Sequence, residues 1–240
     1  MRTIGAPVPA GASASNAPCA DSSDDVVGRL GRLRLVPVAI VEDLAHAEPL
    51  AQALIAGGLP CVEVTMRTPA AESVLARMAE DPHLLVGAGT VVRPEQVERV
   101  VAAGARFVVT PGFSSSVVAA CREIGVPVIP GVATATEVVM GLDAGLDVLK
   151  FFPAEAAGGL AALAALSAPF AGTRFIPTGG ISQDKTGSYL EHPSVLAVGG
   201  SWMVAPALLS AGDFPGIEQR TREAVLRVAS LRSACESGRP

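Results

Sequence analysis

Short apolar runs recur along this sequence at intervals of 20 to 27 residues, and an amphipathic segment fills each interval. A short apolar run bounded by turn residues is typical of a buried strand, and apolar residues three to four positions apart are typical of a helix. Strands that alternate with helices form a parallel sheet. The eight runs begin near Val36, Cys61, Leu85, Phe107, Val128, Val148, Phe175 and Val195.

The number of units favours one parallel architecture over another. Eight units without a second domain predict a compact, closed (β/α)8 TIM barrel, an α/β fold, rather than an open doubly wound sheet. The first unit, VPVAIVEDLAHAEP, also lacks the glycines of a dinucleotide-binding turn. We expect one barrel domain over residues 29–234, with a last helix from Phe214 to Leu231. Residues 1–28 are rich in Gly, Ala, Ser and Pro without an apolar period, which predicts a flexible tail.

Composition excludes several classes of function. A formal net charge of −5 argues against nucleic-acid or membrane-surface binding, which needs a basic face. No apolar run reaches the roughly 18 residues of a membrane-spanning helix. The histidines and cysteines show no metal-ligand spacing, so we expect neither a metal ion nor a cofactor. The four cysteines form no disulfide pattern, and we expect reduced thiols in the cytoplasm.

Candidate functional residues lie where the predicted strands end, because barrels of this kind bind ligands at the C-terminal ends of their strands. Alternation along CVEVTMR turns Glu63, Thr65 and Arg67 toward the barrel interior. The same alternation along VLKFF turns Lys150 and Phe152 inward. A carboxylate, an arginine and a lysine therefore converge at one end of the barrel, where buried charges are costly unless they are paired or used.

The inward lysine is unusual, because the chain has 16 arginines but only two lysines, Lys150 and Lys185. One interpretation is a buried Glu63–Lys150 ion pair that only fills space. The other is a Schiff-base lysine with a carboxylate that moves protons, since burial and a nearby arginine lower the pKa of a lysine and favour the nucleophilic amine. Lys185 lies in the polar segment ISQDKTGS, and we expect a solvated surface residue there.

Seven segments carry a resemblance to a known family. In unbroken order across residues 29–232 the chain resembles the 2-keto-3-deoxy-6-phosphogluconate (KDPG) aldolases, members of which often also act on 4-hydroxy-2-oxoglutarate (KHG). The resemblance implies a class I, metal-independent Schiff-base aldolase on a (β/α)8 barrel, usually a homotrimer. The segments are EVTMRT (63–68), GAGT (87–90), VVTPGF (108–113), VIPGVAT (128–134), LKFFPAE (149–155), FIPTGGI (175–181) and VGGSW (198–202).

The resemblance also implies roles for single residues. Lys150 is similar to the Schiff-base lysine and Glu63 to the general acid and base. A phosphate site is expected independently after the seventh and eighth strands, where backbone N–H groups can approach an anion. The other implied substrate contacts are Arg67 and Thr90 at the carboxylate, Pro111 and Phe152 at the pocket walls, and Thr178, Gly179, Gly180, Gly199, Gly200 and Ser201 at the phosphate.

The expected activity is cleavage of KDPG to pyruvate and D-glyceraldehyde 3-phosphate, and of KHG to pyruvate and glyoxylate. Three alternatives remain open. The first is an aldolase for a related 2-keto-3-deoxy sugar acid, such as the phosphogalactonate epimer. The second is a phosphate-binding barrel isomerase or synthase, which shares the glycine turns but has no need of an inward lysine. The third is a non-catalytic binder of sugar-acid phosphates.

Overall fold

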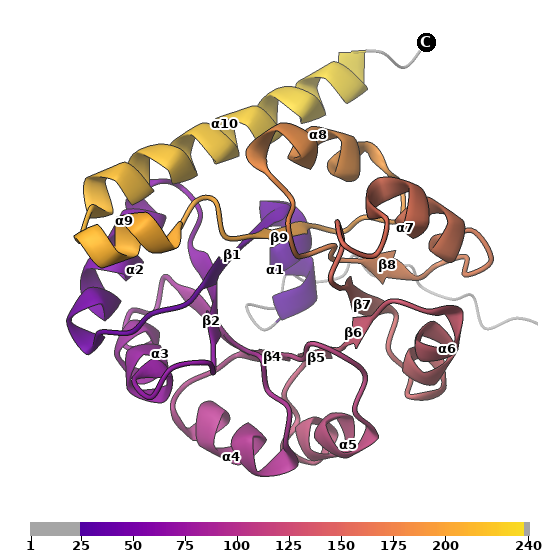
Figure 1. Cartoon of the computed structure of the whole chain (residues 1–240), viewed down its shortest axis with the longest axis horizontal. Coiled ribbons are helices and arrows are strands. Elements are labelled where there is room, and N and C mark those ends of the chain that lie inside the picture. Colours follow the sequence, from indigo (N-terminus) through magenta and orange to yellow (C-terminus); the bar gives the residue numbers. More distant parts are fainter. Residues whose placement is uncertain (1–24, 238–240) are drawn as a thin grey trace, which may run out of the picture.

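The strands of the described chain pair in parallel and close into a ring that helices surround (Figure 1). The computed structural model describes the backbone of residues 25–237 and the side chains of residues 25–231. One sheet has the order β5-β4-β3-β2-β1-β9 and the other the order β6-β7-β8. The strands are β1 (Leu35–Ala39), β2 (Cys61–Thr65), β3 (Leu85–Gly89), β4 (Phe107–Val109), β5 (Val128–Ile129), β6 (Gly131–Val132), β7 (Val148–Phe151), β8 (Arg174–Phe175) and β9 (Val198–Gly200).

The two sheets are parts of one barrel and meet at two places. The first place is Pro130, which connects β5 directly to β6. Because proline has no N–H to donate, it interrupts the ladder, and the fifth barrel strand is divided between the two sheets. On the other side, isolated parallel bridges pair Phe175 with Val195 and Thr178 with Gly199. The predicted (β/α)8 barrel is thereby confirmed, with its fifth strand recorded in two pieces.

Helices cover the outside of the barrel, and the last one lies across α2, α8 and α9 (Figure 1). No helix of the described residues is long and apolar enough to cross a membrane. The helices are α1 (Val26–Leu33), the short 3-10 helix η1 (Leu44–His46), α2 (Ala47–Ala56), α3 (Ala71–Ala79), α4 (Pro94–Ala102), α5 (Ser115–Ile124), α6 (Ala135–Asp143), α7 (Gly159–Ser167), α8 (Gln183–Glu191), α9 (Pro206–Ala211) and α10 (Phe214–Ser237).

Helix α1 closes the N-terminal end of the barrel. Arg29 donates hydrogen bonds to the carbonyl oxygens of Pro60 (3.2 Å) and His83 (2.6 Å), in the segments that lead into β2 and β3. Arg34, which follows the helix, donates to the carbonyl oxygen of Val195 at 3.0 Å. These contacts tie α1 to strand starts on both sides of the barrel, so the opposite end is left for ligands.

The tail predicted for residues 1–28 ends earlier than expected. Helix α1 begins at Val26, and the side chain of Asp25 accepts a hydrogen bond from the backbone N–H of Gly28. The apolar spacing does not indicate this helix, because its first turn follows a segment without apolar period. Residues 1–24 of the predicted tail lie outside the described residues.

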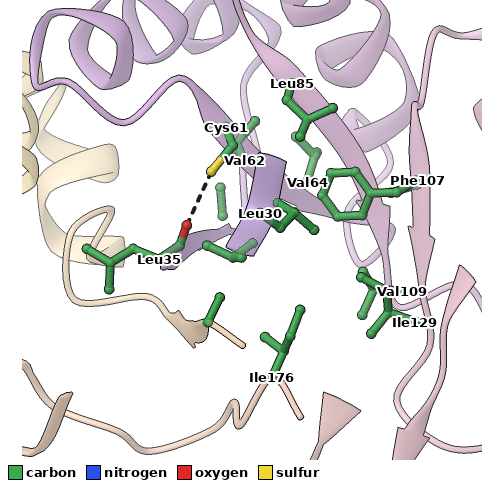
Figure 2. Close-up of a cluster of buried hydrophobic side chains, with 14 of the residues drawn as sticks. Leu30, Leu35, Cys61, Val62, Val64, Leu85, Phe107, Val109, Ile129 and Ile176 are labelled. Carbon is green, nitrogen blue, oxygen red and sulfur yellow. Dashed lines mark hydrogen bonds between the residues drawn. The ribbon is translucent and has the colours of Figure 1, made fainter. Parts of the chain in front are cut away.

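Apolar side chains fill the barrel interior above α1. Figure 2 shows Leu30 of α1 among Phe107, Val109 and Ile129, which come from neighbouring strands. The ring of Phe107 occupies space that a side chain at residue 87 would need, because a Cβ there would lie 2.2 Å from the ring. Tight packing at this level confines polar groups to the C-terminal end of the barrel.

We expect the Leu30→Ala variant to lower the free energy of unfolding by about 2–5 kcal/mol, because it opens a cavity in a core that cannot fully relax. Leu30 is fully buried, whereas Leu226 on α10 is 63% exposed and provides the matched control. Leu226→Ala should change the free energy by less than ~0.5 kcal/mol. Urea unfolding of both variants measures the difference. Equal effects would mean that α1 does not pack beneath the barrel.

Candidate active site

The site begins with two charged side chains from different parts of the barrel. Glu63 is the third residue of β2 and Lys150 the third residue of β7. Period-two alternation turns both inward, and the structure brings them together as this pattern predicted. Glu63 lies two residues before the end of β2 and Lys150 one residue before the end of β7, so the pair sits above the apolar interior and below the mouth.

The pair is close and shielded from water. Lys150 Nζ lies 3.1 Å from Glu63 Oε1 and 3.5 Å from Glu63 Oε2. Their side chains are only 7% and 4% exposed. A charge buried this deeply is costly unless an opposite charge accompanies it, so each side chain depends on the other.

Two glycines make room for this end of the barrel. Gly89 pairs with Thr65 across β2 and β3, and a Cβ at residue 89 would lie 2.2 Å from Glu63 Oε1. Gly131 pairs with Lys150 across β6 and β7, and a Cβ at residue 131 would lie 2.3 Å from the carbonyl oxygen of Pro111. Larger residues at these positions would displace the carboxylate or the Pro111 segment.

Phe152 borders the pair, and the backbone of Pro111 lies close to Gly131, the strand partner of Lys150. The Nζ atom of Lys150 lies 5.2 Å from the centroid of the Phe152 ring, within the range of a cation–π contact. Pro111 follows β4 and approaches β6 at Gly131. Both residues are partly buried, as pocket-lining groups are.

The two residues expected at a carboxylate lie at the same end of the barrel. Arg67 follows β2, is exposed, and makes no side-chain hydrogen bond or ion pair with any residue from 25 to 231. Thr90 follows β3 with a φ of 58°. This left-handed conformation is rare for a β-branched residue, and such strain is concentrated at functional sites.

The residues expected at a phosphate form two neighbouring turns. Thr178 is buried and pairs with Gly199, where a Cβ would lie 2.2 Å from Thr178 Oγ1. Gly179 and Gly180 have φ values of 106° and 77°, which favour glycine and place no side chain over the backbone N–H groups. Ser201 follows β9 and is exposed.

Trp202 is packed beside these turns. Its ring fills the space at Gly200, where a Cβ would lie 1.6 Å from the indole. Glycine at residue 200 is therefore required by the Trp202 ring. The contact fixes the segment that carries Ser201.

The two cysteines whose side chains the structure describes, Cys61 and Cys121, contribute no chemistry at this site. Cys61 shares the inward face of β2 but lies deeper, where its Sγ donates a hydrogen bond to the carbonyl oxygen of Leu35 (Figure 2). Burial raises the pKa of the Cys61 thiol to about 12, and burial also raises that of Cys121 to about 11. Both thiols are neutral near pH 7 and serve as packing groups.

Sequence reasoning missed a polar cluster behind the glycine turns. Glu155 accepts a hydrogen bond from the hydroxyl of Tyr189 at 2.6 Å and forms an ion pair with Lys185. Lys185 is more than half exposed, as expected, but its ammonium is paired rather than simply solvated. The sequence offers one indication of this cluster: the second of its two lysines and its only tyrosine lie four residues apart.

The site offers a nucleophile, a proton acceptor and anion-binding turns. Lys150 can attack a carbonyl carbon once its amine is neutral, and Glu63 lies close enough to take the proton. Among the residues that the structure describes, no three His, Cys, Asp or Glu side chains are grouped to hold a metal ion. The geometry therefore suits covalent amine chemistry on an anionic keto acid.

Comparison with known proteins gives a consistent result. Residues 26–220 match the family described as "Aldolase: KDPG and KHG aldolase". The chain is 52% identical over 186 residues to the 2-dehydro-3-deoxy-phosphogluconate aldolase of Treponema pallidum, which covers 77% of this chain and 89% of the relative. It is 47% identical over 192 residues to the KHG/KDPG aldolase of Escherichia coli K12, which covers 80% of this chain and 90% of the relative.

A solved structure shows the same likeness in three dimensions. The KDPG aldolase of Legionella pneumophila superposes with a TM-score of 0.80 at 40% identity, covering 82% of this chain and 97% of that one. That crystal structure contains pyruvate captured at low pH as a covalent carbinolamine intermediate.

Proposed function

The chain belongs to the family of KDPG and KHG aldolases, and we propose that it is a class I aldolase that splits KDPG into pyruvate and D-glyceraldehyde 3-phosphate. Lys150 forms the Schiff base and Glu63 moves the protons. One observation carries the proposal: the amine of Lys150 lies 3.1 Å from the carboxylate of Glu63, and both side chains are almost fully buried. The covalent pyruvate adduct of the Legionella relative supports the same chemistry.

The position of the pair favours catalysis over simple space filling. A buried ion pair is a weak means of stabilising a fold, and apolar residues of similar size often serve as well. Lys150 lies one residue before the end of β7, and (β/α)8 barrels carry their active sites at these strand ends. Arg67, which has no side-chain partner among residues 25–231, lies at the same end of the barrel as the strained Thr90 and the glycine turns.

The reaction starts with proton transfer from the ammonium of Lys150 to Glu63, which leaves a neutral amine. The nitrogen lone pair attacks the C2 ketone of KDPG and forms a carbinolamine. Loss of the C2 oxygen as water, with Glu63 returning its proton to that oxygen, gives an iminium. The positive nitrogen then withdraws electrons from the neighbouring carbon atoms.

Cleavage uses the same two residues. Glu63, directly or through a water molecule, takes the proton of the C4 hydroxyl. The C3–C4 bond breaks, its electron pair moves into the iminium to form an enamine, and glyceraldehyde 3-phosphate leaves. Protonation of the enamine at C3 and hydrolysis then release pyruvate and regenerate Lys150.

Substrate is held at both ends in this proposal. Arg67 and Thr90 bind the carboxylate of the pyruvyl part, because the exposed guanidinium of Arg67, which has no partner among residues 25–231, can pair with an anion. Pro111 and Phe152 line the path between the two ends. The phosphate lies against Thr178, Gly179, Gly180, Gly199, Gly200 and Ser201. The N–H groups of Thr178 and Gly199 already donate to the carbonyl oxygens of Phe151 and Pro177. The donors proposed for phosphate are therefore the N–H groups of the Gly179–Gly180 turn and the hydroxyl of Ser201.

The same steps act on KHG, which shares the ketone at C2 and the hydroxyl at C4, and they give pyruvate and glyoxylate. An aldolase for the phosphogalactonate epimer would use the same residues, and only kinetics with each epimer separates the two. A barrel isomerase or synthase remains the weaker alternative, because its chemistry gives no role to the buried lysine.

We extend the proposal to the conditions of the reaction. The iminium withdraws the electrons that a Lewis acid would otherwise withdraw, so the reaction is metal-independent and needs no cofactor. The enzyme assembles as a homotrimer, and the exposed apolar side chains of Val139, Met140 and Leu142 on α6 are groups that a second copy can cover. The buried reduced thiols fit a cytoplasmic protein.

Purified protein should release pyruvate from KDPG at the same rate with and without EDTA, as measured by coupling to lactate dehydrogenase. Activity that EDTA removes and a divalent ion restores would place the protein in the other class of aldolases.

The Lys150→Met variant keeps most of the side-chain volume but has no amine, and it should be inactive on KDPG and KHG alike in the same assay. Retained activity in Lys150→Met would exclude the Schiff base.

The Ser201→Ala variant should affect the phosphorylated substrate alone. Loss of a hydrogen bond to a charged group costs about 1.5–3 kcal/mol, so kcat/KM for KDPG should fall by roughly one to two decades. Cleavage of KHG, which has no phosphate, should change little. Ser230 on α10 is exposed outside the barrel, and Ser230→Ala is the matched control. Equal losses on both substrates would assign Ser201 to the scaffold.

A further inference from the structure

The cluster of Glu155, Lys185 and Tyr189 is separate from the residues proposed to contact the substrate. Glu155 ends the segment LKFFPAE that begins beside the Schiff-base lysine, and the other two lie on α8. Tyr189 is only 1% exposed, and its hydroxyl donates to Glu155 Oε1 at 2.6 Å. Lys185 pairs with the other carboxylate oxygen, Oε2, from the solvent side.

Glu155 is connected by its backbone to the glycine turn after β8. Its N–H donates to the carbonyl oxygen of Gly179 at 3.0 Å, and the N–H of Ala154 donates to that of Thr178 at 2.8 Å. The loop after β7 and the loop after β8 are therefore joined edge to edge. Any shift of Glu155 shifts the turn as well.

The side chain of Glu155 passes directly over the second glycine of this turn. A Cβ at residue 180 would lie 2.9 Å from Glu155 Cβ, so only glycine leaves the carboxylate a path toward α8. At residue 179 a Cβ would lie 3.3 Å from the ring of Phe152. The turn is thus enclosed between Phe152, which borders Lys150, and Glu155, which is fixed to α8.

Electrostatics keeps the cluster in one state. The hydrogen bonds from Lys185 and then Tyr189 hold the pKa of the Glu155 carboxyl below its usual range. Burial, followed by the bond to Glu155, raises the pKa of the Tyr189 hydroxyl. At neutral pH the carboxylate is ionised and the tyrosine keeps its proton, so the charge-assisted bond persists.

We propose that Glu155 is a positioning residue of the phosphate end: fixed by Tyr189 and Lys185, it holds the Gly179–Gly180 turn at a set place relative to Lys150 and so determines preference for phosphorylated keto acids. The inference rests on the proposed function, because it takes the turn to be where phosphate binds. Glu155 touches no reacting atom. Its effect is on the KM of phosphorylated substrates and not on the chemical step.

The Tyr189→Phe variant tests this with the loss of one oxygen atom. KM for KDPG should rise about five- to tenfold, a fraction of what losing a direct hydrogen bond to a charged group costs, with kcat nearly unchanged. KM and kcat for KHG should stay at wild-type values. Inhibition by inorganic phosphate should weaken to a similar degree, while inhibition by pyruvate should not. Ser188→Ala, which removes an exposed hydroxyl from the same helix, should change none of these.

A second pair of variants covers the case in which Tyr189→Phe folds poorly. Lys185 is 58% exposed, so Lys185→Met should fold normally and raise KM for KDPG in the same selective way. Lys185→Arg keeps the ion pair with Glu155 and should restore the wild-type KM. The positioning role would be overturned if KM for KDPG and KM for KHG changed equally in these variants. It would also be overturned if KM for KDPG stayed at the wild-type value in both Tyr189→Phe and Lys185→Met.

The phosphate assignment itself is judged separately by Ser201→Ala. If Ser201→Ala weakens KDPG alone while Tyr189→Phe and Lys185→Met affect both substrates equally, the proposed function stands and the role of Glu155 is wrong. If Ser201→Ala also affects both substrates equally, the phosphate site was placed wrongly.

Discussion

The carboxylate of Glu63 and the amine of Lys150 are buried together in the barrel, and each is tolerated there because the other is 3.1 Å away. This condition determines much of the surrounding structure. β2 and β7 must face each other across a closed barrel, which helix α1 and the apolar interior hold in shape. Residues 89 and 131 must be glycine, since a Cβ at either would meet the Glu63 carboxylate or the Pro111 backbone. This buried pair, a weak means of stabilising a fold, is the one that can carry the chemistry.

The two ends of the barrel are specialised in opposite ways. At the N-terminal end, α1 closes the barrel through hydrogen bonds from Arg29 and Arg34 to strand-start carbonyls. At the C-terminal end, Thr90 and the Gly179–Gly180 turn have left-handed backbone conformations, and Ser201 is exposed. The rigid N-terminal end thus supports the strained Thr90 and the glycine turns at the C-terminal end, where barrels of this kind carry their active sites.

The sequence pattern predicts some of these features and not others, for physical reasons. Alternation along a strand has a period of two, and it predicts Glu63 and Lys150 as charges on the inward side, where charges are rare. Pro130 splits the fifth strand, and α1 begins at Val26, details that depend on local hydrogen bonds and not on apolar spacing. The contact between Glu155 and Tyr189 joins residues 34 positions apart and depends on how α8 packs against two loops, so no local pattern could indicate it.

The most direct test of the account is borohydride reduction in the presence of pyruvate, followed by peptide mapping. Reduction converts an iminium into a stable secondary amine, so the label records which lysine formed the Schiff base. The chain offers two lysines, one buried beside Glu63 and one more than half exposed beside Glu155. Exposure alone would favour labelling at Lys185, whereas the account predicts the pyruvate adduct at Lys150 and none at Lys185. Labelling of Lys185 alone, or of neither lysine, would contradict the assignment of Lys150 as the nucleophile.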